Sequence, residues 1–190
     1  MHWKDLESDI KLGTLSDALR QLDCLSAVRA IANLMLGVRI YASPSCVETV
    51  TSHVKSDKHE VGGLLIGQVW QQDVKARSPA EALIILDEAV PSADYRNSSV
   101  SLEMGTDVWN RVNQRLSAEK IVVGWYHSHP NLGAFFSGTD RRTQAAFFNN
   151  DYSLGWVIDP VRHEQRVFVG RDSEEYQPLI LELNHGLEMA

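Results

Sequence analysis

The chain has 190 residues, of which 44% are hydrophobic and 23% charged, and this profile is typical of one globular domain rather than of a disordered or fibrous protein. The 25 acidic residues outnumber the 18 Lys and Arg, and the formal net charge of −7 argues against a nucleic-acid partner. Two cysteines, Cys24 and Cys46, are too few for a disulfide scaffold and favour a reducing compartment. Apolar runs too short to cross a bilayer argue against a membrane partner, so we expect a cytoplasmic protein.

The N-terminal part is predicted to form an amphipathic helix over residues 14–36. Apolar residues recur there at steps of three and four: Leu15, Leu19, Leu22, Leu25, Val28, Ile31 and Met35. Thr14 is suited to cap the start of this helix and Gly37 to end it. The helix either covers a sheet of its own domain or serves in docking or dimerisation. We therefore expect a helical extension over 1–36 and the main domain over 37–190.

The rest of the chain mixes strands and helices without strict alternation. Strands are predicted over residues 38–41, 61–70, 82–86, 121–126, 154–158 and 166–169, with an edge strand over 178–183. Helices are predicted to begin at Ser43-Pro44 and to span 106–116, with Leu116 on the apolar face, and 139–148; a loop is expected over 90–101. This order favours an α/β fold in which a mixed sheet is flanked by helices.

The most informative segment is Gly-Trp-Tyr-His-Ser-His-Pro, which ends the strand predicted from residue 121. Side chains two apart in a strand point to the same side, so His127 and His129 are predicted to present two imidazoles together. Asp140 follows in the first turn of the next helix. Two imidazoles and one carboxylate are three ligands of the kind that zinc takes in a catalytic site, with a fourth position left for water.

The same residues also fit structural roles. Ser137 and Asp140 have the spacing of a capping box, in which a hydroxyl and an acid bracket a helix start. Histidines two apart can also be a solvated pair on a strand. The coincidence of both patterns, in this order and spacing, favours the metal interpretation.

A hydrolytic zinc site also needs a base that takes a proton from water. The candidate is Glu60, which precedes the apolar run Val-Gly-Gly-Leu-Leu-Ile-Gly and has no packing reason to lie at the mouth of a buried strand. Any strand can begin with an exposed glutamate, so this pattern alone leaves the role of Glu60 open.

The run from Gly124 to Asp140, GWYHSHPNLGAFFSGTD, closely resembles the JAMM motif of MPN-domain (JAB1) zinc metalloproteases. That family includes deubiquitinases of the proteasome lid and the signalosome, and prokaryotic relatives that act on ubiquitin-like proteins. The resemblance covers about residues 38–170 and includes Glu60 with its glycine-rich strand. It implies the MPN fold, with a cytidine-deaminase-like architecture.

The resemblance also implies roles for individual residues. By the resemblance, the ligands of one zinc ion are His127, His129 and Asp140. Glu60 becomes the general base and acid, and Ser137 a hydroxyl that stabilises the oxyanion. Ala134 stands where eukaryotic deubiquitinases commonly carry a cysteine, so cysteine-based control at that position is not implied.

The implied function is that of a zinc isopeptidase or peptidase that cleaves after the C-terminus of a ubiquitin-like protein. Activating and conjugating enzymes are the implied associates. Two biological roles remain open. One is deconjugation, in systems of which some are linked to antiphage defence, and the other is the processing of sulfur-carrier proteins. The loop over 90–101 resembles an insertion that holds the substrate tail, while Phe135 and Phe136 either grip that tail or pack their own loop.

Two other functions compete with the protease. One is a scaffold that recruits partners through the helix over 14–36, and the intact set of five site residues argues against it. The other is a metal hydrolase that acts on a non-protein substrate, for which the chain offers no phosphate-binding loop or basic cluster.

Overall fold

A computed structural model describes residues 13–14, 20, 39–71, 82–93, 106–117, 120–176 and 181–182. These residues form a mixed sheet in the order β8-β7-β6-β5-β3-β4-β2-β9, with β1 paired to β3. The strands are β1 (Gly13–Thr14), β2 (Ile40–Ala42), β3 (Gly62–Gln71), β4 (Ala82–Pro91), β5 (Ile121–Ser128), β6 (Leu154–Asp159), β7 (Glu164–Val169), β8 (Glu174–Tyr176) and β9 (Leu181–Glu182). The helices are α3 (Pro44–Ser56), α4 (Thr106–Asn113) and α5 (Gly138–Phe147).

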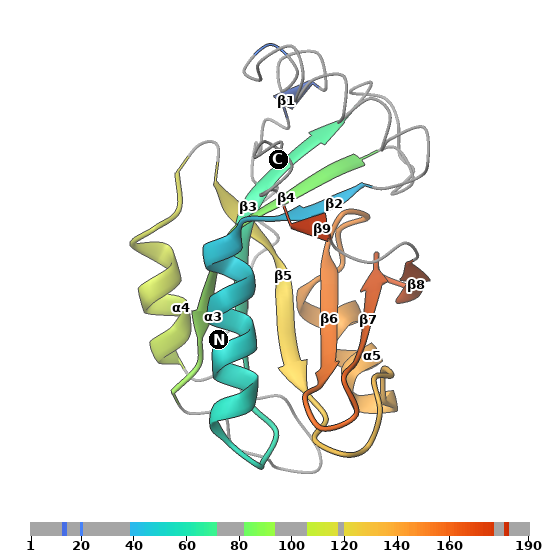
Figure 1. The fold of residues 1–190 in the computed structure, drawn as a ribbon. Coiled ribbons are helices and arrows are strands. Elements are labelled where there is room, and N and C mark those ends of the chain that lie inside the picture. The colour runs from blue at the N-terminus through green and yellow to red at the C-terminus, as the bar shows by residue number, and fades with distance from the viewer. Residues whose placement is uncertain are drawn as a thin grey trace, which may run out of the picture.

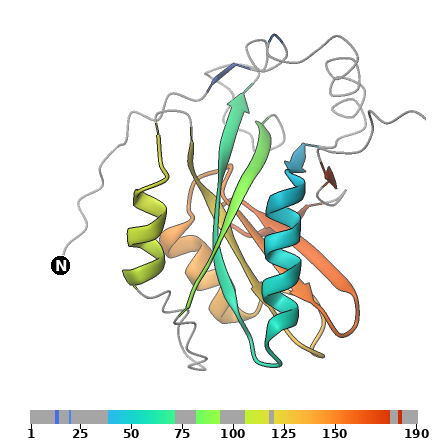
Figure 2. The same ribbon diagram turned by 60° about the vertical axis from the view of Figure 1, so that its left-hand side comes forward.

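Helices cover both faces of the sheet, which confirms the predicted architecture. Figures 1 and 2 show α3 on one face and α4 with α5 on the other. Because side chains alternate along a strand, β3 supplies both cores: Leu65 packs on the α3 side, and Leu64 and Ile66 on the α4 side. Trp125 and Tyr126, neighbours on β5, are both fully buried and divide between the same two cores.

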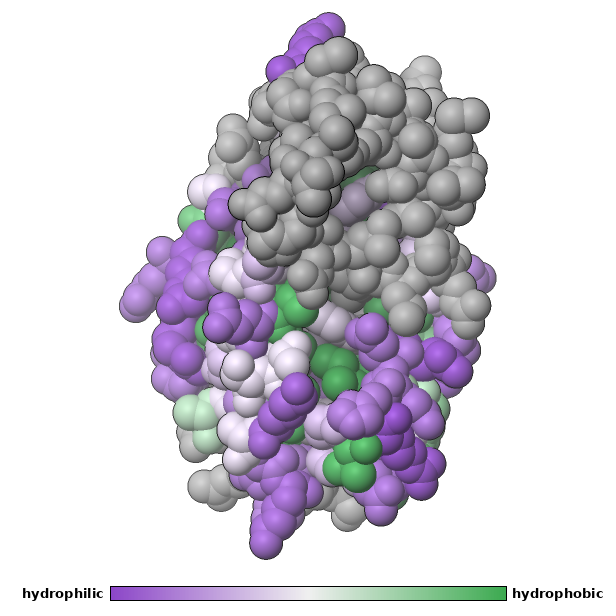
Figure 3. Space-filling model, in the orientation of Figure 1, coloured by the Kyte–Doolittle hydropathy of each residue, from purple (hydrophilic) through white to green (hydrophobic). Residues whose placement is uncertain are grey.

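Helix α3 begins where the sequence predicts. The Ser43 hydroxyl accepts the Cys46 backbone N–H at 3.1 Å, and Pro44 takes the first helical position, where its missing N–H costs nothing. Val50 and Val54 face the sheet and are buried. On the same side of the sheet, a groove of about 220 Å³ lies between α3 and the β6–β7 hairpin. Figure 3 shows hydrophobic residues on this face, framed by hydrophilic ones.

Strand β5 connects the parts of the chain that carry the candidate site. It is antiparallel to β3, with His127 opposite Gly62, and parallel to β6, with His127 opposite Val157. A parallel pair requires a crossover, and here the connection between β5 and β6 contains α5. The end of β5, the start of β3 and the start of α5 therefore meet at the same end of these central strands.

Several predicted element boundaries are wrong: β4, β5 and β7 are longer than predicted, and α4 is shorter. Helix α4 ends at Asn113, because the Arg115 N–H bonds to the Val112 carbonyl at 2.8 Å in a tight turn, and Leu116 is exposed rather than on an apolar helix face. The loop predicted from residue 90 begins later, because Val90 is fully buried and pairs with Leu64 in the β3–β4 ladder. Strand β8 was not predicted, and of the expected edge strand the structure describes β9 alone.

Most of the predicted N-terminal helix lies outside the described residues. Thr14, the expected cap, belongs to β1, which pairs in parallel with the end of β3. The division of the chain between residues 36 and 37 stays a prediction. In the part of the chain that the structure describes, no helix has the length and apolar character to span a membrane.

Candidate metal centre

The two histidines lie side by side at the end of β5. His127 belongs to the strand and His129 follows it, and their Nε2 atoms are 3.1 Å apart. Both side chains are buried. The backbone N–H of His129 donates to the Ile158 carbonyl at 2.9 Å, so this residue continues the alignment of β5 with β6. The two imidazoles therefore face one another, as the strand periodicity predicts.

Asp140 enters this site from the first turn of α5. Its Oδ1 lies 3.4 Å from Nε2 of His127 and its Oδ2 lies 3.7 Å from Nε2 of His129. The same carboxylate forms a capping box: the Ser137 N–H donates to Asp140 Oδ2 at 2.6 Å, and the Asp140 N–H donates to Ser137 Oγ at 3.2 Å. The structural interpretation of this spacing is thus correct, and it coexists with the position beside the histidines.

The spacing of the three side chains fits a metal ion. Their candidate ligand atoms all lie within 4.8 Å of one another. Tetrahedral zinc with ligands at about 2.0–2.1 Å places neighbouring ligand atoms about 3.3–3.4 Å apart. The observed separations are 3.1 Å between the histidines, 3.4 Å between His127 and Asp140 Oδ1, and 3.7 Å between His129 and Asp140 Oδ2. Two imidazoles and a carboxylate also suit zinc and other divalent transition metals chemically.

The protonation states at the site also favour metal binding. Burial, together with the nearby His127, lowers the pKa of His129 to about 4, so its imidazole is neutral at pH 7. Burial raises the pKa of Asp140, but hydrogen bonds from His127 and Ser137 outweigh it and the net pKa is lowered. A metal requires neutral imidazoles and an ionised carboxylate. His129 and Asp140 are therefore in the forms that bind a cation.

Glu60 lies next to this cluster, half-buried, with Oε1 3.8 Å from Nε2 of His129. Burial raises the pKa of Glu60, and Asp140 raises it further while His127 opposes the shift. Two hydrogen bonds hold the chain at this point: the Val61 N–H donates to Ser128 Oγ at 3.0 Å, and the Ser128 N–H donates to the Val61 carbonyl at 2.8 Å. The end of β5 thus places Glu60 beside the histidines, where a carboxylate with a raised pKa suits a proton acceptor.

The two phenylalanines of the following loop have different environments. Phe136 is 6% exposed, and its ring centroid is 5.5 Å from that of Trp125 and 4.2 Å from that of Phe168. This position favours packing over contact with a substrate tail. Phe135 is 46% exposed and its ring centroid is 4.9 Å from that of His129, so it stays a candidate for substrate contact.

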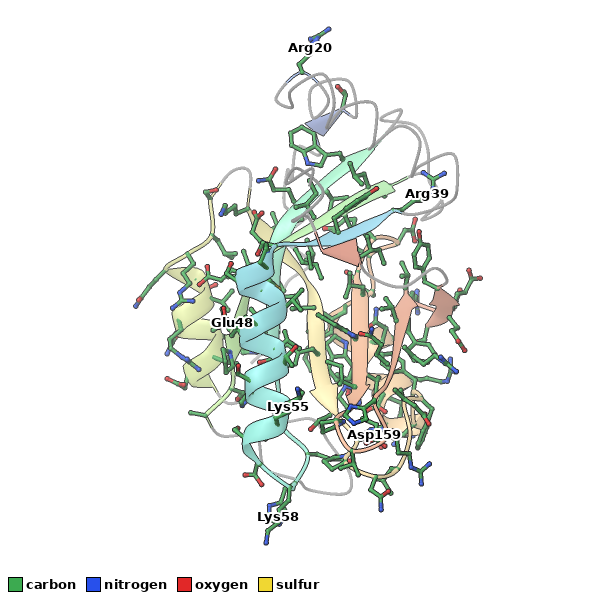
Figure 4. The ribbon with its side chains drawn as sticks, in the orientation of Figure 1. Arg20, Arg39, Glu48, Lys55, Lys58 and Asp159 are labelled. Carbon is green, nitrogen blue, oxygen red and sulfur yellow. The ribbon has the colours of Figure 1, made fainter. Side chains whose placement is uncertain are left out.

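Sequence reasoning gave no role to Asp159, which precedes Pro160 in a pair typical of turns. This residue ends β6, where the strand meets the following turn (Figure 4), and it is fully buried. It accepts four backbone N–H groups at 2.7–3.0 Å, those of Asn131 and Gly133 in the loop after His129 and those of Val161 and Arg162 in the turn after β6. Burial raises the pKa of Asp159, but these four donors lower it to about 2. Asp159 therefore joins the loop after His129 to the β6–β7 turn, a role that an Asp-Pro turn signal does not reveal.

The family described as prokaryotic homologs of the JAB domain matches residues 45–169, a range that includes Glu60 and the three clustered side chains. The 26S proteasome regulatory subunit RPN11 of Candida glabrata is 34% identical over 70 residues, which are 34% of this chain and 23% of that protein. The Lys-63-specific deubiquitinase BRCC36 of Xenopus tropicalis is 34% identical over 110 residues, which are 57% of this chain and 41% of that protein. The chain spans less than half the length of these curated relatives.

The fold is also similar to that of solved structures. Protein DSY2949 from Desulfitobacterium hafniense aligns with a TM-score of 0.50 and 20% identity, over 77% of this chain and 99% of that one. At this identity the likeness concerns the fold alone.

Proposed function

The chain belongs to the family of prokaryotic homologs of the JAB domain, and from this premise we propose that it is a zinc-dependent isopeptidase or peptidase that cleaves after the C-terminus of a ubiquitin-like protein. The observation that carries the proposal is the buried cluster of His127, His129 and Asp140 with Glu60 beside it. A protein substrate is supported by the relative whose name is Lys-63-specific deubiquitinase.

Each site residue has a chemical role in this proposal. The ligands that would hold zinc are His127, His129 and Asp140, and the bound ion would supply a Lewis acid that activates water near neutral pH. Glu60 accepts a proton as water attacks the amide carbon, and it then donates that proton to the leaving amine. The Ser137 hydroxyl donates a hydrogen bond to the oxyanion that develops on the carbonyl oxygen. No covalent intermediate with the protein is required.

The biological setting is a further part of the proposal. We expect the substrate to be a ubiquitin-like protein or its conjugates, with activating and conjugating enzymes as associates in the cytoplasm. Deconjugation, including a role in antiphage defence, and processing of sulfur-carrier precursors differ in whether the bond that is cut is an isopeptide or a linear peptide bond. A substrate set that contains both bond types separates them.

The experiment offers the zinc-loaded protein each ubiquitin-like protein of the source organism, either extended by a C-terminal peptide or joined through its C-terminus to a lysine side chain. We expect cleavage directly after the ubiquitin-like part, its loss on chelation and its return with zinc. Glu60→Gln, which keeps the shape of the side chain but not its basicity, is expected to bind zinc normally and to lose about 100- to 10,000-fold in turnover.

Two results would contradict the proposal. Turnover by Glu60→Gln at the parent rate would remove Glu60 from the role of base. A protein that binds zinc yet cleaves none of the substrates would favour the scaffold interpretation instead.

A further inference from the structure

Trp125 forms a parallel stack with one of the clustered histidines. Trp125 and His127 are two positions apart on β5, so their side chains lie on the same face of the sheet. Their centroids are 4.5 Å apart and their planes differ by only 10°. Both side chains are fully buried, so the indole restricts rotation of the imidazole about its terminal torsion.

The indole is itself fixed by Gln144, which lies one helical turn after Asp140 on α5. Gln144 Oε1 accepts the Trp125 Nε1–H at 2.7 Å. The amide nitrogen of Gln144 donates toward three backbone carbonyls at 3.0–3.2 Å, those of Phe148, Ser153 and Gly170. Gln144 is fully buried, so its amide is held by these partners rather than by water. Helix α5 thus carries both the acidic member of the cluster and the residue that anchors the indole.

The neighbouring strand leaves room for this arrangement through a glycine. Gly155 on β6 lies opposite Trp125 in the parallel ladder. A Cβ atom at that position would be 2.2 Å from Cζ of Phe136 and 3.2 Å from Nε1 of Trp125. Any other residue would push against both rings, so the aromatic packing around His127 depends on this glycine.

Nδ1, the ring nitrogen of His127 that faces away from the cluster, lacks the hydrogen bond that usually orients a metal-binding histidine. A histidine that binds a metal through one nitrogen usually donates its second ring N–H to a carboxylate, a carbonyl or water, and this bond orients the ring. Nδ1 of His127 is buried and has no hydrogen-bond partner among the residues that the structure describes. Among the described contacts of the His127 ring, the stack with Trp125 is the one placed to fix its plane.

We propose that Trp125 and Gln144 are positioning residues. Gln144 anchors the indole of Trp125, and the indole orients the His127 ring for metal binding in place of a hydrogen bond at Nδ1. The inference rests on the proposed function, because it takes His127 to be a metal ligand. Its measurable consequence is the affinity of the folded protein for the metal alone, which does not depend on knowledge of the substrate.

The sheet provides a matched control on its other face. Trp156 on β6 is 5% exposed, and its Nε1–H donates to Gln165 Oε1 at 3.0 Å. Trp156 belongs to the core on the α3 side, away from His127, and Gln165 lies half-buried beside it. Substitutions there remove the same chemical groups from the same sheet, so they separate a general loss of stability from a specific effect on the metal.

The experiment measures zinc affinity by competition with a chromophoric chelator, on apo protein held well below its melting temperature. Trp125→Leu and Gln144→Met are expected to weaken zinc binding about 10- to 100-fold, which is the usual cost of removing a group that orients a ligand. Trp125→Phe keeps an aromatic face against the imidazole and is expected to retain most of the affinity, which covers the case in which Trp125→Leu fails to fold. Trp156→Leu and Gln165→Met are expected to bind zinc as the parent does.

Cobalt provides an independent readout of the ligand geometry. Its visible absorption bands respond to the arrangement of the ligands, and we expect them to change in Gln144→Met and to be preserved in Gln165→Met. A purely structural role of Gln144 would leave these bands unaltered.

The outcomes also separate this inference from the proposed function. If the parent binds and uses zinc while the Trp125 and Gln144 variants bind it no more weakly than the two controls, the positioning role is overturned and the protease proposal stands. If the parent itself fails to bind zinc, both fall.

Discussion

At the scale of single residues, Asp159 shows how a side chain outside the cluster can hold the loop that adjoins it. It sits between the loop that follows His129 and the turn that follows β6, and it accepts four backbone N–H groups. A buried carboxylate with several N–H donors strongly favours its ionised form. The loop that separates His129 from Ser137 is therefore held by the Asp159 carboxylate, which must remain ionised.

This arrangement predicts a stability that depends on pH. Because the folded-state pKa of Asp159, about 2, lies below the ordinary value of 3.8, its contribution is complete above the ordinary pKa and is lost as the pH falls toward 2. Asp159→Asn is expected to lower the free energy of unfolding at neutral pH by about 2 kcal/mol or more. Urea unfolding of both proteins at neutral and acidic pH tests this.

The difference between parent and variant should shrink as the pH falls from about 4 toward 2. Asp172→Asn, a change at an exposed aspartate, is the control and should differ little from the parent at any pH. A difference between Asp159→Asn and the parent that stays constant with pH would mean that the carboxylate charge is not what holds the loop.

At the scale of the elements, the start of α5 combines capping with placement of a ligand. One oxygen of Asp140 accepts the Ser137 N–H, and the other lies toward His127. An N-terminal helix position also favours a negative charge, because the backbone N–H groups point toward it. The helix start therefore stabilises the carboxylate that the proposed site requires.

Substitution of Ser137 can separate capping from catalysis. Asparagine is as good an N-cap as serine, so Ser137→Asn is expected to keep the free energy of unfolding within about 1 kcal/mol while cleavage falls roughly 100- to 1000-fold through loss of the hydroxyl. Ser137→Ala should lose both functions, with an unfolding free energy about 0.5–2 kcal/mol lower. Denaturant unfolding and a cleavage assay on the same preparations measure the two effects. Full cleavage activity in Ser137→Asn would limit Ser137 to capping.

At the scale of the whole molecule, the candidate ligands come from two different elements of the chain. Two come from the end of β5 and one from α5, and the crossover to β6 brings them together. An ion bound only by the folded state stabilises that state by mass action. Metal binding and global stability should therefore be linked.

We expect zinc at 100 times its dissociation constant to stabilise the protein by about 2.7 kcal/mol, which raises the Tm of a chain of this size by roughly 5–10 °C. The pKa of His129, lowered to about 4, keeps its imidazole neutral at higher pH, so the gain is present at neutral pH and lost as the pH falls toward 4. Thermal unfolding with and without zinc tests this. His127→Ala should abolish the shift and His163→Asn, at an exposed turn, should keep it.

Local patterns account for the parts of the structure that were predicted. Alternation along β5 placed His127 and His129 on one side, and the Ser43-Pro44 pair marked the start of α3. The motif resemblance selected Glu60 and Ser137 from many acidic and hydroxyl residues. Boundaries were less reliable: α4 stopped before Leu116 because a tight turn, closed by the hydrogen bond from the Arg115 N–H to the Val112 carbonyl, ends the helix.

The sequence by itself determined which side chains share a face, which residues cap a helix and which residue types could bind a metal, because these properties depend on neighbours a few positions apart. Only the tertiary structure decided that Glu60 approaches His129 from 69 residues earlier in the chain, that Phe136 is buried while Phe135 is exposed, and that Asp159 holds the intervening loop. Those outcomes depend on how β3, β5 and β6 align, and long-range strand register is set by packing that no short segment encodes.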